Sequence, residues 1–228
     1  MSLNLETRWR HYREPTLLAA IAGFVDTLGF VALFGLFTAH VTGNLVLAGA
    51  ELAGGKGDVV AKLLAIPVFI VTVGVTTWWV QHSAQRDSRL LAKIMLVEAL
   101  WLCAFMFAGT LLHPRSADGW ETIVTGMLGV IAMSIRNAAA RLLLGALTPT
   151  TVMTGSVTQL AIDMTTVLGR KDDVAAARAR MRKTLPAVLG FVAGAALGAF
   201  GYAACGYFSL WLPILVTLWL AAREWRGA

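Results

Sequence analysis

Long apolar stretches separated by short charged segments dominate the pattern of this chain. A membrane-spanning helix needs about 20 mostly apolar residues. Six stretches have that length or come close to it: Thr16–Phe37, Val59–Val80, Leu90–Leu112, Glu121–Leu147, Thr184–Gly206 and Phe208–Ala222. Two shorter and more polar stretches, Val41–Ala53 and Thr151–Leu168, follow the first and the fourth. The pattern predicts an all-α polytopic membrane protein in which residues 1–228 form a single transmembrane domain.

The two short stretches leave two topologies open. As a helix, Val41–Ala53 would rise about 1.5 Å per residue, too little to cover a hydrocarbon core of about 30 Å. We therefore favour six transmembrane helices plus two short broken or re-entrant helices; the alternative is eight crossing helices. In both topologies most Lys and Arg residues fall on one side of the membrane. This side is predicted to be cytoplasmic, with both termini and a basic loop at 169–183.

The two halves of the chain share an ordered set of features. Each half has a short polar motif, an acid seven residues after the motif's third position, a Gly/Lys/Asp turn and a span with an early proline. The pairs are Thr42-Gly43-Asn44 with Thr154-Gly155-Ser156, Glu51 with Asp163, and Pro67 with Pro186. We expect a first repeat at 16–112 and a second at 121–222. Three crossings per half would make a 3+3 inverted repeat, common among transporters, and four would make a parallel 4+4 repeat.

Composition supports a membrane protein and argues against several other classes. The chain is 57% hydrophobic and 14% charged, with a mean hydropathy of +0.70, whereas soluble domains have about 25% charged residues. The net charge of +6 is spread between the apolar stretches, so no nucleic-acid partner is expected. Cys103 and Cys205 lie inside apolar stretches and lack metal-ligand spacing. No metal and no cofactor are predicted.

The two short motifs are the first part of a predicted solute site. Thr42 and Thr154 are predicted N-caps, and Gly43 and Gly155 allow the backbone to break. Each motif would then begin a half-helix whose free N–H groups and positive dipole end could hold an anion or a polar solute. A close-packed helix crossing at these glycines is an equally open interpretation.

Ionisable and amide groups at mid-span complete the predicted site, because such groups are costly in a membrane and usually face a partner or a wet cavity. Asp26 is expected to meet Arg136 or Asn137 across the repeat axis, as a structural ion pair, a gate or a proton site. His40 and Glu51 are expected to be solvated. The full set of predicted substrate-binding residues is Asp26, Thr42, Gly43, Asn44, Arg136, Asn137, Thr154, Gly155, Ser156, Gln159 and Asp163.

Several of these segments resemble one known family. Ala22-Gly23-Phe24-Val25-Asp26, Thr42-Gly43-Asn44, Arg136-Asn137-Ala138 and the run from Pro149 to Gly155 resemble the YoaK-like family of bacterial integral membrane proteins (DUF1275). The resemblance covers about residues 15–222. It implies a multi-pass protein of the bacterial inner (plasma) membrane and no established activity. The family pattern has Gln where this chain has Arg136, and often Asn where it has Ser156.

Three functions follow from these features. The first is a transporter or channel for a small polar or anionic solute. The second is an intramembrane enzyme acting on a lipid or quinone through Asp26, His40 and Glu98, although no His-Glu-x-x-His pair or nucleophile elbow is present and catalysis is not expected. The third is a non-catalytic assembly partner. The face formed by Gly190, Gly194 and Gly198 predicts a tight helix contact, either within one protomer or in a homo-oligomer.

Overall fold

The computed structural model describes residues 13–55, 57–83, 89–144, 153–169 and 173–227, and this part of the chain is helical, without a strand. The predicted features at 149–152 lie outside the described residues. The elements are α2 (Glu14–Ala32), α3 (Val41–Ala53), α4 (Val60–His82), α5 (Leu90–Leu112), α6 (Trp120–Leu142), α7 (Met153–Leu168), α8 (Val174–Cys205), the 3-10 helix η2 (Gly206–Leu210) and α9 (Trp211–Gly227).

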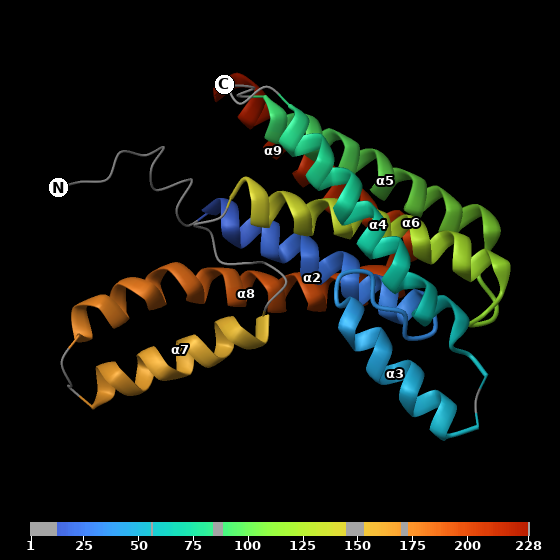
Figure 1. Ribbon diagram of the computed structural model, residues 1–228, viewed down its shortest axis with the longest axis horizontal. Coiled ribbons are helices and arrows are strands. Elements are labelled where there is room, and N and C mark those ends of the chain that lie inside the picture. Colours follow the sequence, from blue (N-terminus) through green and yellow to red (C-terminus); the bar gives the residue numbers. More distant parts are fainter. Residues whose placement is uncertain (1–12, 56, 84–88, 145–152, 170–172, 228) are drawn as a thin grey trace.

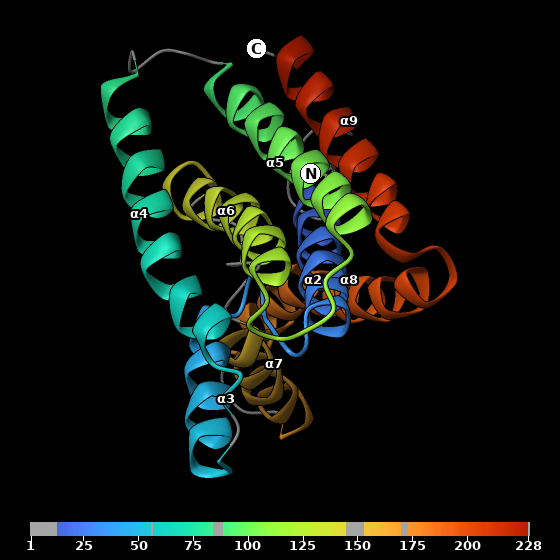
Figure 2. The same cartoon turned by 90° about the vertical axis from the view of Figure 1, so that its right-hand side faces the viewer.

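Five helical stretches of the described chain are long and apolar enough to cross a membrane. They are α2, α4, α5, α6 and the run Val174–Gly227, which contains α8, η2 and α9. Within that run Gly206 has a φ of +59°, a left-handed conformation that favours glycine. The chain changes direction there, and α9 leaves at a steep angle to α8 (Figure 2). The prediction of an all-α, multi-pass membrane protein is confirmed.

Helix bounds follow the apolar pattern, with shifts of a few residues at several ends, and two differences have a clear physical cause. α3 and α5 have the predicted bounds. α2 ends at Ala32 rather than near Phe37, because Phe34 and Gly35 adopt left-handed conformations that turn the chain. The predicted basic loop at 169–183 is helical from Val174 onward, since its alanines are strong helix formers.

The closest packing in the bundle joins α2 to α8. Gly190, Gly194 and Gly198 place the α8 backbone directly against α2, where a Cβ at Gly194 would overlap the carbonyl oxygen of Ala20 and one at Gly198 that of Phe24. Small residues permit this approach of two backbones in a membrane protein. The predicted glycine contact therefore lies within the protomer.

The half-helices α3 and α7 lie on one side of the bundle formed by the longer helices. α3 packs on α4 and α7 packs on α8. Figure 1 shows that both begin near the centre of the molecule and run toward opposite ends, α3 to the right and α7 to the left. Of the longer helices, α4 and α5 pack on α6, and α5 also packs on α9.

The glycine contact generates the first testable prediction. Gly194→Ala should lower the free energy of unfolding by about 1–3 kcal/mol, because overpacking forces the two backbones apart. Gly74→Ala is the matched control: no atom lies within 4 Å of the added methyl, and alanine gains up to about 1 kcal/mol of helix propensity. Thermal unfolding in detergent measures both variants. Equal midpoints for the two would contradict the packing described here.

Candidate functional site

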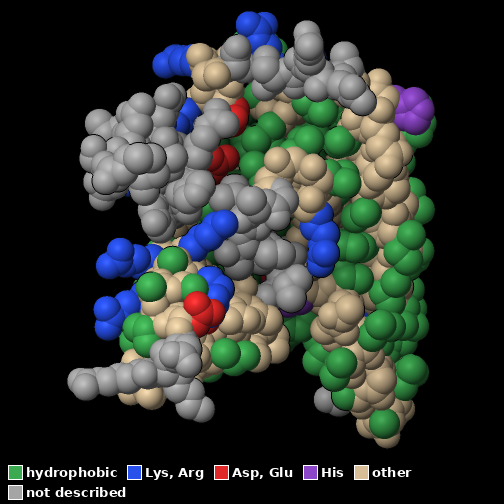
Figure 3. Space-filling view, turned by 60° about the vertical axis from the view of Figure 1, so that its left-hand side comes forward, with side chains coloured by type: hydrophobic (Ala, Val, Ile, Leu, Met, Phe, Trp, Pro, Cys, Tyr) green, Lys and Arg blue, Asp and Glu red, His purple; other side chains and the backbone are tan. Residues whose placement is uncertain are grey.

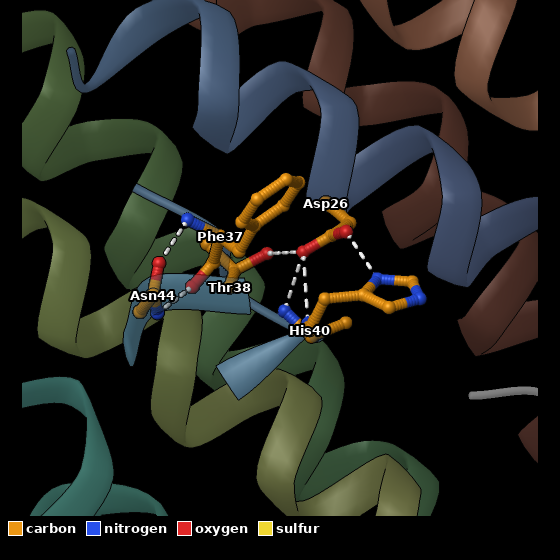
Figure 4. Close-up of polar contacts among 6 residues, drawn as sticks. Asp26, Phe37, Thr38, His40 and Asn44 are labelled. Carbon is orange, nitrogen blue, oxygen red and sulfur yellow. Dashed lines mark hydrogen bonds and ion pairs between the residues drawn. The ribbon is translucent and has the colours of Figure 1, made fainter. Parts of the chain in front are cut away.

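Asp26 holds the segment of chain that leads into α3. Its buried carboxylate is only 3% exposed. The Oδ1 atom accepts hydrogen bonds from the backbone N–H of Ala39 at 2.6 Å and of His40 at 3.3 Å, and from the hydroxyl of Thr38 at 3.5 Å. The Oδ2 atom lies 2.6 Å from Nδ1 of His40 (Figure 4). A carboxylate of the protein thus lies at the start of α3, where a helix dipole favours negative charge.

Asn44 clamps the same segment from the other side. Its Oδ1 accepts from the backbone N–H of Phe37 and its Nδ2 donates to the carbonyl of Phe37, both at 2.9 Å (Figure 4). Backbone groups released by a helix break inside a membrane need such partners. A Cβ at Gly43 would lie 2.9 Å from the Phe37 ring, so glycine lets this ring lie against the start of α3. The first motif therefore holds the non-helical connection between α2 and α3 in place.

The predicted threonine caps differ from the structure. α3 begins at Val41 as expected, but its N-cap residue is His40, and Thr42 lies exposed in the first turn without a capping bond. Asp26 already accepts N–H groups just before the helix, so a threonine cap is not needed there. In the second motif Thr154 lies inside α7, where it and Gly155 are exposed and Ser156 is buried.

Each half-helix carries an acid that pairs with a base on the helix after it. Glu51 on α3 lies 3.1 Å from Nζ of Lys62 on α4, and Lys62 is only 2% exposed. Asp163 on α7 accepts from Nη2 and Nε of Arg180 on α8 at 2.7 and 2.9 Å. Gln159 also donates to Asp163, at 3.1 Å. Glu51 is thus paired rather than solvated, and the two halves use the same kind of contact.

Sequence reasoning overlooked Lys62 and Arg180, although a signal was available. Both are basic residues near the start of the helix that follows a half-helix acid. Lys62 also donates to the carbonyl oxygens of Phe34 at 3.1 Å and Asp58 at 3.2 Å. It therefore ties the α2–α3 connection, α3 and the start of α4 together.

The prediction that Asp26 meets Arg136 or Asn137 is wrong. Arg136 instead pairs with Glu98 on α5, donating from Nε at 2.6 Å. Its other nitrogens donate to the carbonyl of Leu18 on α2 at 3.3 Å and to the hydroxyl of Thr217 on α9 at 3.2 Å. Arg136 therefore connects four helices, a structural role; contact with a solute stays a prediction.

Asn137 differs from its neighbour. It is about nine-tenths buried, and its Oδ1 has no hydrogen-bond partner within the described residues. When residues 23–26 are aligned with residues 134–137, this neutral amide stands where the first half has Asp26. The two related positions therefore differ in charge.

His40 is more constrained than a solvated histidine. Its ring contacts the rings of Phe37 and of Phe191 on α8 edge-on, with centroids 6.0 and 5.6 Å apart. The hydrogen bond to Asp26 raises the pKa of His40 above its ordinary value, and partial burial opposes that rise. The histidine thus links the acid on α2 to the aromatic surface of α8.

The Arg136 contact generates a second prediction. Glu98→Gln should lower the free energy of unfolding by about 3–5 kcal/mol, because it leaves a buried charge without its counter-charge. The double variant Glu98→Leu/Arg136→Met replaces both charges with apolar groups and should be markedly more stable than Glu98→Gln. Chemical unfolding in detergent provides the comparison, and a double variant less stable than the single one would count against the proposed pairing.

The Asp26–His40 contact generates a third prediction, on pH. Because the pKa of His40 is raised in the folded protein, its stabilisation is fully present below the unfolded value of about 6.5 and is lost as pH rises through the folded value. His40→Gln should therefore lower the melting temperature more at pH 6 than at pH 9. His113→Gln, at an exposed position after α5, is the control. A His40→Gln effect that does not vary with pH would contradict the linkage.

Comparisons with known proteins place the chain in a family. The family model described as "Protein of unknown function (DUF1275)" matches residues 15–222, which include every residue of the predicted site. The UPF0700 transmembrane protein YoaK of Bacillus subtilis (strain 168) is 30% identical over 206 residues, covering 88% of each chain. No solved structure matches. The chain therefore belongs to the DUF1275 family.

Proposed function

We propose that this protein is a transporter or channel for a small polar or anionic solute, bound between the start of α3 and the start of α7. The observation that carries the proposal is the placement of these two half-helices. Both begin near the centre of the molecule and run to opposite ends (Figure 1). Broken helices with such central starts form substrate sites in many transporters.

Helix packing supports a 3+3 inverted repeat. α2 packs on α8 as α6 packs on α4, and α3 packs on α4 as α7 packs on α8. An axis that exchanges the halves at 16–112 and 121–222 would convert each pair into the other, and would map the α5–α9 contact onto itself. Six crossings plus two half-helices fit this arrangement, because α3 has 13 residues and α7 has 16, and Gly206 divides the final helical run. The basic segments favour cytoplasmic termini, and the family resemblance implies a bacterial inner membrane location.

The two ends of the proposed site differ in chemistry. At the start of α3 the Asp26 carboxylate occupies the position where a bound anion would lie. This end of the site would therefore bind the hydrogen-bond donors of a solute, or a proton. In the second half, Ser156 in the first turn of α7 and the neutral Asn137 on α6 offer buried polar groups without a negative charge. The negative part of a solute would therefore bind at the α7 end, near Thr154 and Gly155. Asp163, which accepts a hydrogen bond from Gln159 of the same helix, holds α7 against α8 through Arg180.

The test is flux through the purified protein in liposomes, against a panel of small anions and neutral polar solutes, with and without a proton gradient. We expect wild-type flux for at least one solute. Asp26→Asn should reduce it about tenfold or more, because the amide cannot accept all the contacts that position the start of α3. Asp58→Asn, an exposed acid in the turn before α4, is the matched control and should leave flux unchanged.

Two results would oppose the proposal. One is an absence of wild-type flux over the whole panel in correctly folded protein. The other is full flux in Asp26→Asn. Conversion of a lipid or quinone extract without flux would favour the enzyme alternative, and a stably co-purifying membrane protein would favour the assembly role.

A further inference from the structure

A cavity of about 500 Å³ opens between α7 and the first turns of α8, away from the proposed solute site. Its lining residues are Val167, Arg178, Met181, Arg182, Leu185 and Pro186. Figure 3 shows basic and apolar side chains side by side over this part of the molecule, at the lower left. The cavity therefore combines two positive groups with a mainly apolar wall.

The two arginines of this cavity lie one helical turn apart on one face of α8. Arg180, between them, is the residue that binds Asp163. Arg178 and Arg182 make no hydrogen bond or ion pair with any described residue. Like charges at this spacing repel one another. An anion bound between the two guanidinium groups would remove that repulsion and accept charge-assisted hydrogen bonds.

A proline inside α8, Pro186, forms part of the cavity wall. Pro186 has no N–H, so the carbonyl of Arg182, four residues earlier, has no helical donor. A proline inside a helix also bends it. The apolar wall continues beyond this point along α8 through Leu185, Leu189 and Val192, whose exposed fractions are 39%, 58% and 59%. This surface belongs to a candidate membrane span, so the cavity is continuous with a lipid-facing surface.

We propose that this cavity binds an anionic phospholipid, with the phosphate between Arg178 and Arg182 and an acyl chain along Leu185 and Leu189. A free anion would use the arginines alone, whereas a lipid uses both the arginines and the apolar wall. The related segment of the first half offers no such pair of charges: counted from the matched prolines Pro67 and Pro186, apolar Val59 and Leu63 stand where this half has Arg178 and Arg182. The bound lipid would contact α7 at Val167, one helical turn beyond Asp163, and α8 at its two arginines. This inference does not depend on solute transport.

The experiment uses the full-length chain purified in a neutral detergent. Phosphatidylglycerol and phosphatidylcholine are titrated in mixed micelles, and lipid retention is measured by native mass spectrometry together with thermal stabilisation. The variant Arg178→Gln/Arg182→Gln should bind phosphatidylglycerol about tenfold or more weakly. The control Arg115→Gln/Arg141→Gln removes the same charge from two exposed positions outside the cavity and should stay within about twofold of wild type.

A second pair of variants tests the apolar wall and does not alter charge. Leu185→Ser should weaken phosphatidylglycerol binding several-fold, whereas Leu212→Ser, on the exposed surface of α9, should not. Unchanged phosphatidylglycerol binding in the arginine variant, or equal binding of phosphatidylcholine by wild type, would overturn the proposal. So would inorganic phosphate binding as tightly as the lipid, because the cavity would then be a site for a free anion.

Discussion

A guanidinium group buried in a helix bundle must find its counter-charge and its hydrogen-bond acceptors inside the protein, and Arg136 imposes this condition on four helices at once. Glu98 on α5 supplies the charge, while Leu18 on α2 and Thr217 on α9 supply acceptors. These contacts fix the depth of α2 relative to α6. Because Asp26 lies two turns farther along α2, the position of the proposed site also depends on the buried arginine.

The start of α3 shows how a chain can return into a bundle of apolar helices. Between Ala32 and Val41 the backbone is not helical, and its polar groups need partners that lipid cannot provide. Asp26 and Asn44 supply them, and Lys62 takes the carbonyl of Phe34. The side chains that sequence reasoning assigned to solute are thus partly engaged in maintaining the break. A solute site would use what these contacts leave free, together with the neutral amide of Asn137, whose Oδ1 has no partner among the described residues.

Much of the fold could be predicted from the sequence because long apolar stretches indicate which segments can form helices in a lipid bilayer. Val41–Ala53 and Leu90–Leu112 were predicted to the residue, and the glycine face of α8 was recognised. The contact partners of the buried polar side chains were harder to predict. The expected repeat indicates which positions would be equivalent, but equivalent positions need not touch, so Asp26 was matched with the wrong half. Its hydrogen-bond partners lie about a dozen residues later in the same half, in the connection that leads into α3. Glu98 carried a usable signal, since an acid inside an apolar span requires a base at similar depth.

The contact between α2 and α8 also has a consequence for biogenesis. α2 is made first, yet the helix that covers its backbone belongs to the last quarter of the chain. While the ribosome synthesises the intervening segments, lipid tails must occupy the surface that α8 will later cover, and α8 must displace them to close the bundle. The nascent protein therefore stays open until translation is nearly finished. This interval exposes it to insertion chaperones and quality-control proteases.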